Sequence, residues 1–564
     1  MTQSINADAA RNGRVIQAIS NSAIKDNLTK TALGRLTAAW PLVIFLLLPA
    51  LTRAETAVQA WVQLYNGPGN GDDQAKAVVV DGSNDVIVTG YSRGSGGYYE
   101  YATIKYSSAG IPLWTNRYDG PGNSTPYTLA ALAVDGSNSV IVTGCSSNGS
   151  NDDYATIKYT SAGVPLWTNR YNGSGNDDDQ AKAVVVDGSN NVIVTGYSVG
   201  AGSYPDYLTI KYSSAGVPLW TNRYNGPGNS WDQANAVAVD GSNNVIVTGY
   251  AEVSGSRMYY QWDYVTIKYS SEGMPLWTNR YNGPGNDGDL AYGVAVDGNN
   301  DVIVTGYSLG SGGYMDYATI KYSSAGVPLW TNLYNGLGDG NSYARAVTVD
   351  GSDNVTVTGY SCTNGMGNAD YATIKYSSAG VPLWTNRYNG PGNGPDQAYA
   401  VAVDASGSVI VMGYSAASGT YPIYHYDYAT IKYSSAGVPL WTNRYNMPGN
   451  GSDRVAALAL DHSGNVIVAG YSTGSGGNND FATVKYICVP SPVVSGLQLT
   501  NGAFQMRVDD VLQPGTLVIE AATNLSTKNW TPVFTNTTPT NVLYYTDPDA
   551  GNGTARFYRA FQFP

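Results

Sequence analysis

The chain has 564 residues, including 67 Gly, 46 Tyr and 12 Trp; only 13% of residues are charged, and the formal net charge is −12. Its two His exclude a metal site built from several histidines and leave little scope for a Ser-His-Asp triad, and three Cys are too few for a disulfide framework. The acidic balance argues against nucleic-acid binding, which needs a basic surface.

The start of the chain has the pattern of a secretory signal. Residues 41–51 form an apolar run too short to span a bilayer, basic residues precede it, and small residues suited to cleavage lead up to Ala54. We expect residues 1–54 to be a signal peptide with a long basic region, and the mature protein to be secreted or exposed on the cell surface. The alternative is a membrane anchor that is not cleaved.

A repeat of about 53 residues follows, over residues 59–486. Each copy contains four short segments rich in β-branched and aromatic residues; in the fourth copy they cover residues 218–224, 236–240, 245–250 and 263–269. Four antiparallel strands in each repeat are the unit of a β-propeller, so we predict an all-β fold with an eight-bladed ring. One Trp marks each copy: Trp61, Trp114, Trp167, Trp220, Trp277, Trp330, Trp384 and Trp441.

The repeated unit VDGSNNVIVTGYS…DYATIKYSSAGVPLW resembles the bacterial β-propeller repeat family known as SBBP, and all eight copies share the resemblance. The resemblance implies a propeller fold and a secreted or cell-surface location. It implies no catalytic residue, because that family has no shared catalytic motif.

The two ends of the repeat array predict how the ring closes. The first Trp segment, residues 60–66, has no partner segments before it, and the last segment, residues 481–486, has no Trp segment after it. The small side chains of AVAVD suit a crowded axis, and the alternating WTNRY suits the rim. We therefore predict that the N-terminal strand completes the last blade as its outermost strand; the alternative places the Trp strands innermost. In the predicted register both long loops of each blade share one face, which is the candidate functional face.

Acidic residues recur in both long loops. They admit two interpretations: a ring of carboxylates that binds Ca²⁺ or a cationic partner, or carboxylates that each accept backbone N–H groups in their own loop, which the eightfold repetition favours. We predict no required cofactor, with Ca²⁺ as a possibility. One acidic residue opens each DYATIKY segment: Glu100, Asp153, Asp206, Asp263, Asp316, Asp370, Asp427 and Asp480. The weak metal candidates are those of the other loop: Asp73, Asp179, Asp232, Asp289, Asp396 and Asp453.

Aromatic residues crowd one of the long loops, and the fourth and seventh copies carry aromatic insertions there. Exposed rings beside Asp and Asn suit sugar recognition, because the ring face packs on C–H groups while polar groups bind hydroxyls. The alternative is that these rings seal the junctions between blades. The candidate ligand-binding residues are Tyr98, Tyr99, Tyr259, Tyr260, Trp262, Tyr314, Tyr424 and Tyr426.

Catalysis finds no support in the repeat. His425 and His462 are far apart in the array, and Cys145 and Cys362 belong to copies expected on opposite sides of the ring. An active site needs several different residues that meet once, whereas near-identical blades supply the same residue eight times. We predict a monomeric, non-enzymatic protein that binds an extracellular polysaccharide or a surface protein through the long-loop face, with no nucleic acid and no membrane contact beyond a signal or anchor. The alternatives are a purely structural extracellular scaffold and a polysaccharide hydrolase or lyase.

Beyond the repeat, we expect residues 487–495 to be a linker and residues 496–564 to be a small β domain of the sandwich type, because its segments alternate like strands. The pattern IEAATNLSTKNWTPV…FYRA resembles a short C-terminal module of secreted bacterial proteins, which implies surface attachment or sorting. The alternative is an ordinary accessory domain.

Overall fold

The computed structural model contains two compact units, Gln59–Tyr486 and a second that comprises Met1–Val58 and Ile487–Pro564. Residues 1–54, with the predicted signal peptide, lie outside the described part. Within the described part, no helix has the length and apolar character needed to cross a membrane. The structure describes residues 55–122, 131–202, 204–253, 261–338, 340–363, 369–420, 423–447, 451–474, 476–490, 493–500, 503–509, 516–522, 531–537, 542–547 and 557–563.

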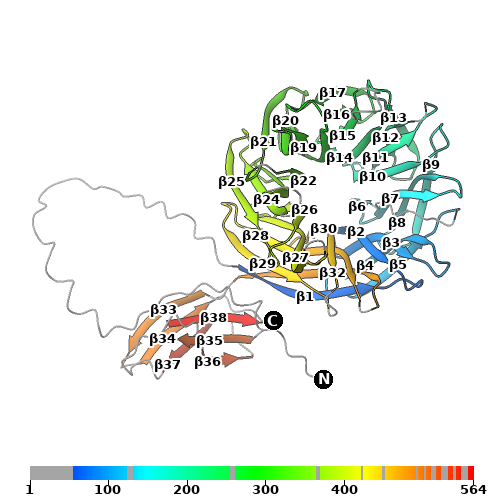
Figure 1. The fold of residues 1–564 in the computed structure, drawn as a ribbon. Helices are drawn as coiled ribbons and strands as arrows, with labels where there is room; N and C mark the ends of the chain where they lie inside the picture. The colour runs from blue at the N-terminus through cyan, green and yellow to red at the C-terminus, as the bar shows by residue number, and fades with distance from the viewer. Residues whose placement is uncertain are drawn as a thin grey trace, which may run out of the picture. The chain divides into compact units, whose positions relative to one another are not determined.

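The repeat folds into eight four-stranded antiparallel sheets arranged as the blades of a propeller, with their first strands around the axis (Figure 1). Blade 1 runs outward through β2 (Asp73–Val80), β3 (Val86–Arg93), β4 (Tyr99–Tyr106) and β5 (Pro112–Tyr118). The next blades follow the same order: β6 (Ala131–Val134), β7 (Val140–Ser147), β8 (Asp152–Tyr159) and β9 (Pro165–Tyr171) in blade 2; β10 (Asp179–Val186), β11 (Val192–Val199), β12 (Pro205–Tyr212) and β13 (Pro218–Tyr224) in blade 3; β14 (Asp232–Val239), β15 (Val245–Glu252), β16 (Trp262–Tyr269) and β17 (Pro275–Tyr281) in blade 4. Then come β18 (Leu290–Val296), β19 (Val302–Leu309), β20 (Met315–Tyr322) and β21 (Pro328–Tyr334) in blade 5; β22 (Ser342–Val349), β23 (Val355–Cys362), β24 (Ala369–Tyr376) and β25 (Pro382–Tyr388) in blade 6; β26 (Asp396–Val403), β27 (Val409–Thr420), β28 (Ile423–Tyr433) and β29 (Pro439–Tyr445) in blade 7.

Blade 8 is built from both ends of the array, which confirms the predicted register and closure. Its strand order is β30 (Asp453–Leu460), β31 (Val466–Thr473), β32 (Asn479–Pro490) and then β1 (Glu55–Tyr65), so the N-terminal strand is the outermost strand of the last blade. A second link closes the ring at the tight turns, because the backbone N–H of His462 in blade 8 donates to Oδ1 of Asn84 in blade 1 at 3.0 Å.

The core lies between neighbouring blades. Ile141 and Tyr154 of blade 2 pack against Val192 and Val194 of blade 3, and all four side chains are almost fully buried. The hydroxyl group of Tyr154 donates to the backbone oxygen of Leu208 in blade 3 at 3.3 Å. A Tyr in this position therefore contributes apolar area while its polar group remains satisfied, which explains why the DYATIKY segment repeats it.

The turn between the first and second strands of each blade is held by an Asp and a Lys of the same blade. Asp81 accepts the backbone N–H groups of Ser83 and Asp85, and Asn84 adopts a positive φ of 63°. The Nζ atom of Lys105 lies 2.6 Å from Oδ2 of Asp81, and both side chains are buried. The repeated sequences DGSNN and TIKY therefore form one buried ion pair, in which the turn supplies the carboxylate and the third strand supplies the cation.

The C-terminal part contains two three-stranded sheets. One has the order β33 (Val493–Thr500), β34 (Ala503–Asp509) and β37 (Val542–Asp547), and the other β36 (Thr531–Asn536), β35 (Thr516–Ala522) and β38 (Phe557–Phe563). Buried residues of β34 and β35, among them Met506 and Ile519, belong to one hydrophobic cluster. The small sandwich expected here stays a prediction.

Candidate functional site

Both long loops of every blade lie on one face of the propeller. Because the four strands are antiparallel, the β2–β3 and β4–β5 turns lie at one end of blade 1, and the β3–β4 loop and the connection to blade 2 lie at the other. The two long loops around blade 1 touch: the N–H of Gly69 donates to the backbone oxygen of Arg93 at 3.0 Å. We call this side the long-loop face.

One position of the inner strand carries a different side chain from blade to blade. In blade 1 it is Lys76, which a β-bulge between Ala75 and Ala77 leaves out of the ladder; a bulge of this kind changes the direction of its side chain. Its counterparts lie at the same bulge in other blades and are half-buried. We define the axial cluster as Lys76, Lys182, Asn235, Tyr292, Arg345 and Tyr399.

Arg345 lies in a cage of tyrosine rings from three blades. Its Cζ atom is 4.9 Å from the ring centre of Tyr292 in blade 5, 5.9 and 5.5 Å from those of Tyr343 and Tyr360 in blade 6, and 6.0 Å from that of Tyr399 in blade 7. Nη2 donates to the hydroxyl of Tyr360 at 3.1 Å, whereas Nε is buried and has no hydrogen-bond partner among the described residues. The rings stabilise the cation through their faces.

A second group of rings adjoins this cage. The hydroxyl groups of Tyr399 and Tyr414 both donate to Oε1 of Gln397, at 2.8 and 2.7 Å. The guanidinium carbon of Arg454, an exposed residue of β30, lies 4.9 Å from the Tyr414 ring centre and 5.0 Å from that of Tyr426. Arg454 thus extends the same pattern, a cation on tyrosine faces, into blade 8.

Blades 1 and 3 present a lysine in the corresponding arrangement. Nζ of Lys76 lies 5.2 Å from the Tyr91 ring centre and donates to Oε1 of Gln74 at 3.0 Å. Nζ of Lys182 lies 5.4 Å from the Tyr197 ring centre. Burial lowers the pKa of both lysines, which shows that their charges are incompletely solvated.

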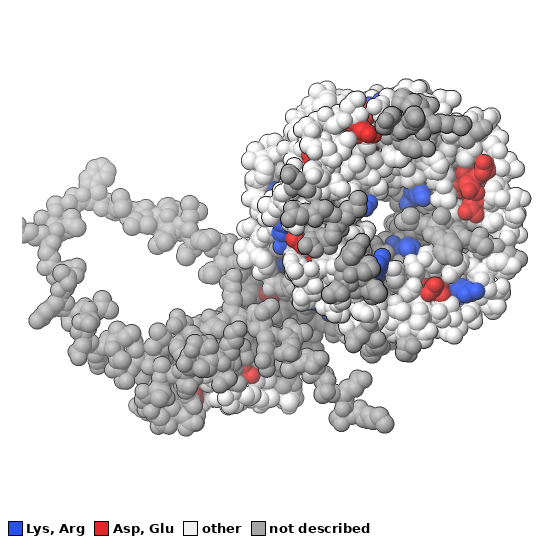
Figure 2. Space-filling view, viewed as in Figure 1, with Lys and Arg blue, Asp and Glu red and all other residues white. Residues whose placement is uncertain are grey.

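Among the described residues, the four cations at the axis have no acidic partner, whereas every other basic side chain of the propeller except Arg93 forms an ion pair. Among the described residues of the propeller, the basic side chains without an ion pair are Lys76, Lys182, Arg345, Arg454 and Arg93, of which Arg93 donates to the backbone oxygen of Gly97 in its own loop. Basic side chains surround the central opening in Figure 2, and acidic ones lie farther out. The Lys of each third strand pairs with a turn Asp: Lys105, Lys158, Lys211, Lys268, Lys321, Lys375, Lys432 and Lys485.

The predicted ligand-binding aromatics divide into two groups. Tyr99 and Trp262 pack on tyrosines of the second strands, with ring centres 5.3 Å from Tyr91 and 5.6 Å from Tyr250. The Tyr426 ring centre lies 4.9 Å from that of Tyr414, and the Tyr424 ring centre lies 6.2 Å from that of Tyr426. These rings therefore extend the axial aromatic surface outward. Tyr98 and Tyr314 are exposed, at 45% and 37%. Tyr259 and Tyr260 lie outside the described residues.

The six weak metal candidates are fully buried and occupied by their own loops. Asp73 accepts the N–H of Gly67 at 2.6 Å and that of Arg93 at 2.9 Å. Burial raises the pKa of Asp232 to about 7 and that of Asp289, Asp396 and Asp453 to about 6. No group of three or more His, Cys, Asp or Glu in the described part of the chain could hold a metal ion. These carboxylates therefore hold the long loops together by accepting backbone N–H groups, as Asp73 does.

The acidic residues that open the third strands form ion pairs at the rim. Asp153 lies 2.8 Å from Nη2 of Arg170 on the outermost strand of its blade; the pairs with Glu100, Asp206, Asp263, Asp370 and Asp427 repeat it. In blade 5 the arginine position holds Leu333, and burial raises the pKa of Asp316 there. In blade 8 the residue at the arginine position of the repeat is Leu64.

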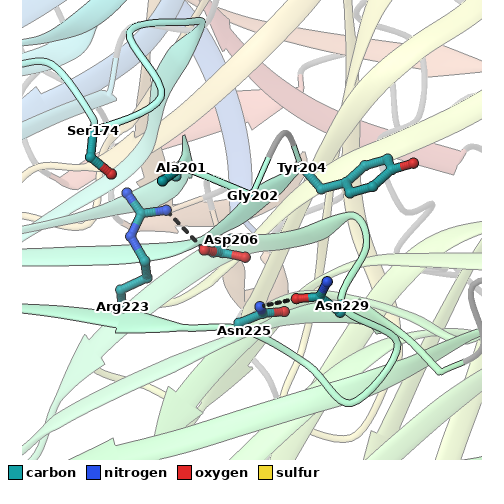
Figure 3. Close-up of a pocket in the computed structure, with 9 residues that line it drawn as sticks. Ser174, Ala201, Gly202, Tyr204, Asp206, Arg223, Asn225 and Asn229 are labelled. Atoms are coloured by element: carbon teal, nitrogen blue, oxygen red, sulfur yellow. Dashed lines mark hydrogen bonds and ion pairs between the residues drawn. The ribbon is translucent and has the colours of Figure 1, made fainter.

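A pocket of about 140 Å³ lies beside one of these pairs, in the long loops of blade 3 (Figure 3). Arg223 Nη1 lies 3.0 Å from Asp206 Oδ2, and Asn225 donates to Oδ1 of Asn229 at 2.6 Å. The ring of Tyr204 points away from Arg223 in the close-up. Since these charged and amide groups bind one another, this pocket is a weaker candidate than the axial cluster.

The sequence interpretation missed the axial cluster and its cations. One position of the inner strand could have revealed it, because this position varies while the rest of the repeat is nearly constant. It is Lys, Asn, Tyr or Arg, and its two neighbours are Ala or Gly. The four inner strands concerned read DQAKAVVV, DQANAVAV, LAYGVAV and SYARAVTV. None of the three cysteines, all of which lie in the described part of the chain, forms a disulfide bond.

No family model and no curated protein matches the chain. Solved propellers resemble it at low identity. Sqt1 from Chaetomium thermophilum, bound to the N-terminus of ribosomal protein L10, is 9% identical over 75% of this chain and 99% of that chain, with a TM-score of 0.47. A protein of unknown function from Dyadobacter fermentans is 10% identical over 76% of this chain and 98% of that chain, with a TM-score of 0.37. The polysaccharide lyase Uly1 is 9% identical over 77% of this chain and 99% of that chain, with a TM-score of 0.40. These similarities carry no argument on function.

Proposed function

We propose that this protein is a non-enzymatic carbohydrate-binding propeller whose ligand lies at the axial mouth, defined as the axial cluster together with Gln397, Arg454 and the tyrosines that contact them. One observation carries the proposal: the axial cluster places different side chains at the point where the blades converge, while the rest of the repeat is nearly constant. A ligand that spans several blades meets distinct groups only there.

The chemistry of the mouth suits a sugar chain. Half-buried tyrosine faces provide surfaces on which C–H groups pack, and the amides of Gln397 and Asn235 can bind hydroxyl groups. The predicted aromatics Tyr99, Trp262 and Tyr426 extend this surface toward the long loops. The mature protein acts as a secreted or surface-exposed monomer in this proposal, on the strength of the signal pattern in residues 1–54 and the SBBP resemblance.

The absence of catalysis in this proposal is supported by where the carboxylates lie. Those of the long loops clamp backbone N–H groups, as Asp73 does, or pair with rim arginines, as Asp153 does. The axial cluster as defined contains no carboxylate. A purely structural scaffold would need the contacts between blades but gains nothing from unpaired cations and rings at the axis.

The test is titration calorimetry of the full chain with a panel of neutral and acidic polysaccharides. We expect at least one to bind, and Tyr426→Ala to weaken that binding about tenfold through loss of one stacking face. The control is Leu166→Ala, which removes an exposed side chain, 52% accessible, from an outermost strand. No binding by any polysaccharide would favour the scaffold, and turnover of the polymer would overturn the non-enzymatic reading.

A further inference from the structure

We infer that the ligand of the axial mouth is an anionic polysaccharide, whose carboxylate groups bind Lys76, Lys182, Arg345 and Arg454. This inference rests on the proposed carbohydrate-binding function and adds the charge of the ligand to it.

The first argument is the distribution of charge. In a chain with a net charge of −12, basic side chains have many potential acidic partners. The third-strand lysine Lys158 lies 2.7 Å from a carboxylate oxygen, and the rim arginine Arg170 lies 2.8 Å from one. The four axial cations lie in the same acidic protein without such a partner among the residues that the structure describes. Lys76, Lys182 and Arg345 are partly buried, and an uncompensated charge in that position costs stability. Their presence in three separate blades, with the exposed Arg454 in a fourth, points to a counter-ion from outside the chain.

The second argument is the geometry of Arg345. Four tyrosine rings hold its planar guanidinium at 4.9 to 6.0 Å, so its orientation is fixed before any ligand arrives. Stacking on ring faces uses the π-surfaces of the guanidinium and leaves N–H groups at its edge for hydrogen bonds. Of its nitrogen atoms, only Nη2 has a hydrogen-bond partner among the described residues, the hydroxyl of Tyr360. A carboxylate accepts hydrogen bonds from an arginine edge in bidentate fashion, so the group that best completes this site is a carboxylate.

The third argument is the spacing of the cations around the ring. Lys76, Lys182, Arg345 and Arg454 belong to blades 1, 3, 6 and 8. A small anion would contact one of them, whereas a polymer that carries a charge on successive sugars contacts several at once and gains affinity from the linkage. The tyrosine beneath each cation offers the adjoining sugar a stacking face. An acidic peptide would supply charge but makes less use of these rings.

The experiment compares polygalacturonate with its fully methyl-esterified form, which has the same sugar backbone without the charge. We expect the full chain to bind polygalacturonate at least about tenfold more tightly, with an affinity that falls steeply with added salt. Arg345→Gln and, separately, Lys182→Gln should each weaken polygalacturonate binding about tenfold and leave binding of the ester unchanged. The matched control is Arg93→Gln, which removes an unpaired cation outside the axial mouth and should change neither affinity.

The outcomes separate this inference from the proposed function. Equal binding of the two polymers, or unchanged affinity in both axial variants at an unchanged melting temperature, overturns the anionic ligand and leaves a binder of neutral sugars. Failure to bind either polymer or any neutral polysaccharide overturns both proposals. Binding of polyglutamate in preference to polygalacturonate overturns the assignment to a polysaccharide.

Discussion

Nε1 of Trp114, on the outermost strand of blade 1, donates a 3.1 Å hydrogen bond to the backbone oxygen of Ser161 in blade 2. The same bond links the other blades in sequence, for example from Trp167 to Ser214. Trp441 in blade 7 is the exception: its Nε1 is buried and has no hydrogen-bond partner in the described structure. The reason is in the chain, because β32 continues to Pro490 where the other blades have the turn SSAG. The eight Trp positions are therefore energetically unequal.

This inequality predicts different costs for one substitution. Trp167→Phe should lower the free energy of unfolding by about 1 kcal/mol more than Trp441→Phe, because it removes a satisfied hydrogen bond to Ser214, whereas Trp441→Phe removes an N–H group that has no partner among the described residues. Thermal unfolding of the two variants, followed by circular dichroism, measures the difference. Equal destabilisation would show that the hydrogen bond to the neighbouring turn contributes nothing beyond packing.

Two glycines with the same backbone conformation should respond differently to alanine. Gly163 and Gly313 both have φ of 81°, but a Cβ atom on Gly163 would lie 2.8 Å from the Trp114 ring, whereas one on Gly313 would meet nothing within 4 Å. Gly313→Ala should cost about 1 kcal/mol through backbone strain alone. Gly163→Ala should cost roughly 2 kcal/mol more, because the clash displaces the Trp ring. Denaturant unfolding checks this, and similar costs would contradict the steric role of the turn glycine.

Blade 5 should gain stability from the arginine that it lacks. Leu333→Arg would place a guanidinium near Asp316, because Leu333 pairs with Ala318 as Arg170, the partner of Asp153, pairs with Ala155. We expect a gain of about 1 kcal/mol at pH 8. The gain should shrink at pH 4, because burial raises the pKa of Asp316 and the protonated acid attracts the cation weakly. Leu333→Gln is the uncharged control. A gain independent of pH, or a gain equalled by Gln, would rule out an ion pair.

The buried loop carboxylates predict an acidic optimum of stability. Burial raises the pKa of Asp232 to about 7 and of Asp289, Asp396 and Asp453 to about 6, from 3.8. A group whose pKa is raised on folding contributes stability below its unfolded pKa, and this contribution is lost as the pH rises through the folded value. For turn carboxylates such as Asp135, burial raises the pKa, but bonds to Lys158 and backbone N–H groups outweigh it and lower the pKa. The stability that these turn carboxylates contribute is fully present above pH 3.8, and it is lost as the pH falls through their lowered pKa in the folded state.

The melting temperature should therefore be highest between about pH 4 and 6 and should fall from pH 6 to 8. Asp232→Asn should make that fall smaller, because it removes the group with the highest pKa among the four. A melting temperature that rises between pH 6 and 8 would contradict the raised pKa values.

The strand order and ring closure were predictable because the evidence for them recurs eight times: small residues in AVAVD for the axis and an unmatched Trp segment at the start of the array. The occupation of Asp73 by its own loop was foreseen as one of two interpretations. The cage of Arg345 was not, since Tyr292, Arg345 and Tyr399 occupy the same position in three repeats and meet only because the blades converge. Such contacts depend on the bulge and the curvature of the ring, which no single repeat displays.

The measurement that tests the central claim most directly is hydroxyl-radical footprinting of the full chain, with and without the polysaccharide of the panel that binds most tightly. We predict reduced modification of Tyr292, Tyr360 and Tyr399, the rings around Arg345. Met274, 66% exposed beside a tight turn on the opposite face, should be modified equally in both samples. Protection of Met274 without protection of the three tyrosines would place the ligand elsewhere and contradict an axial binding site.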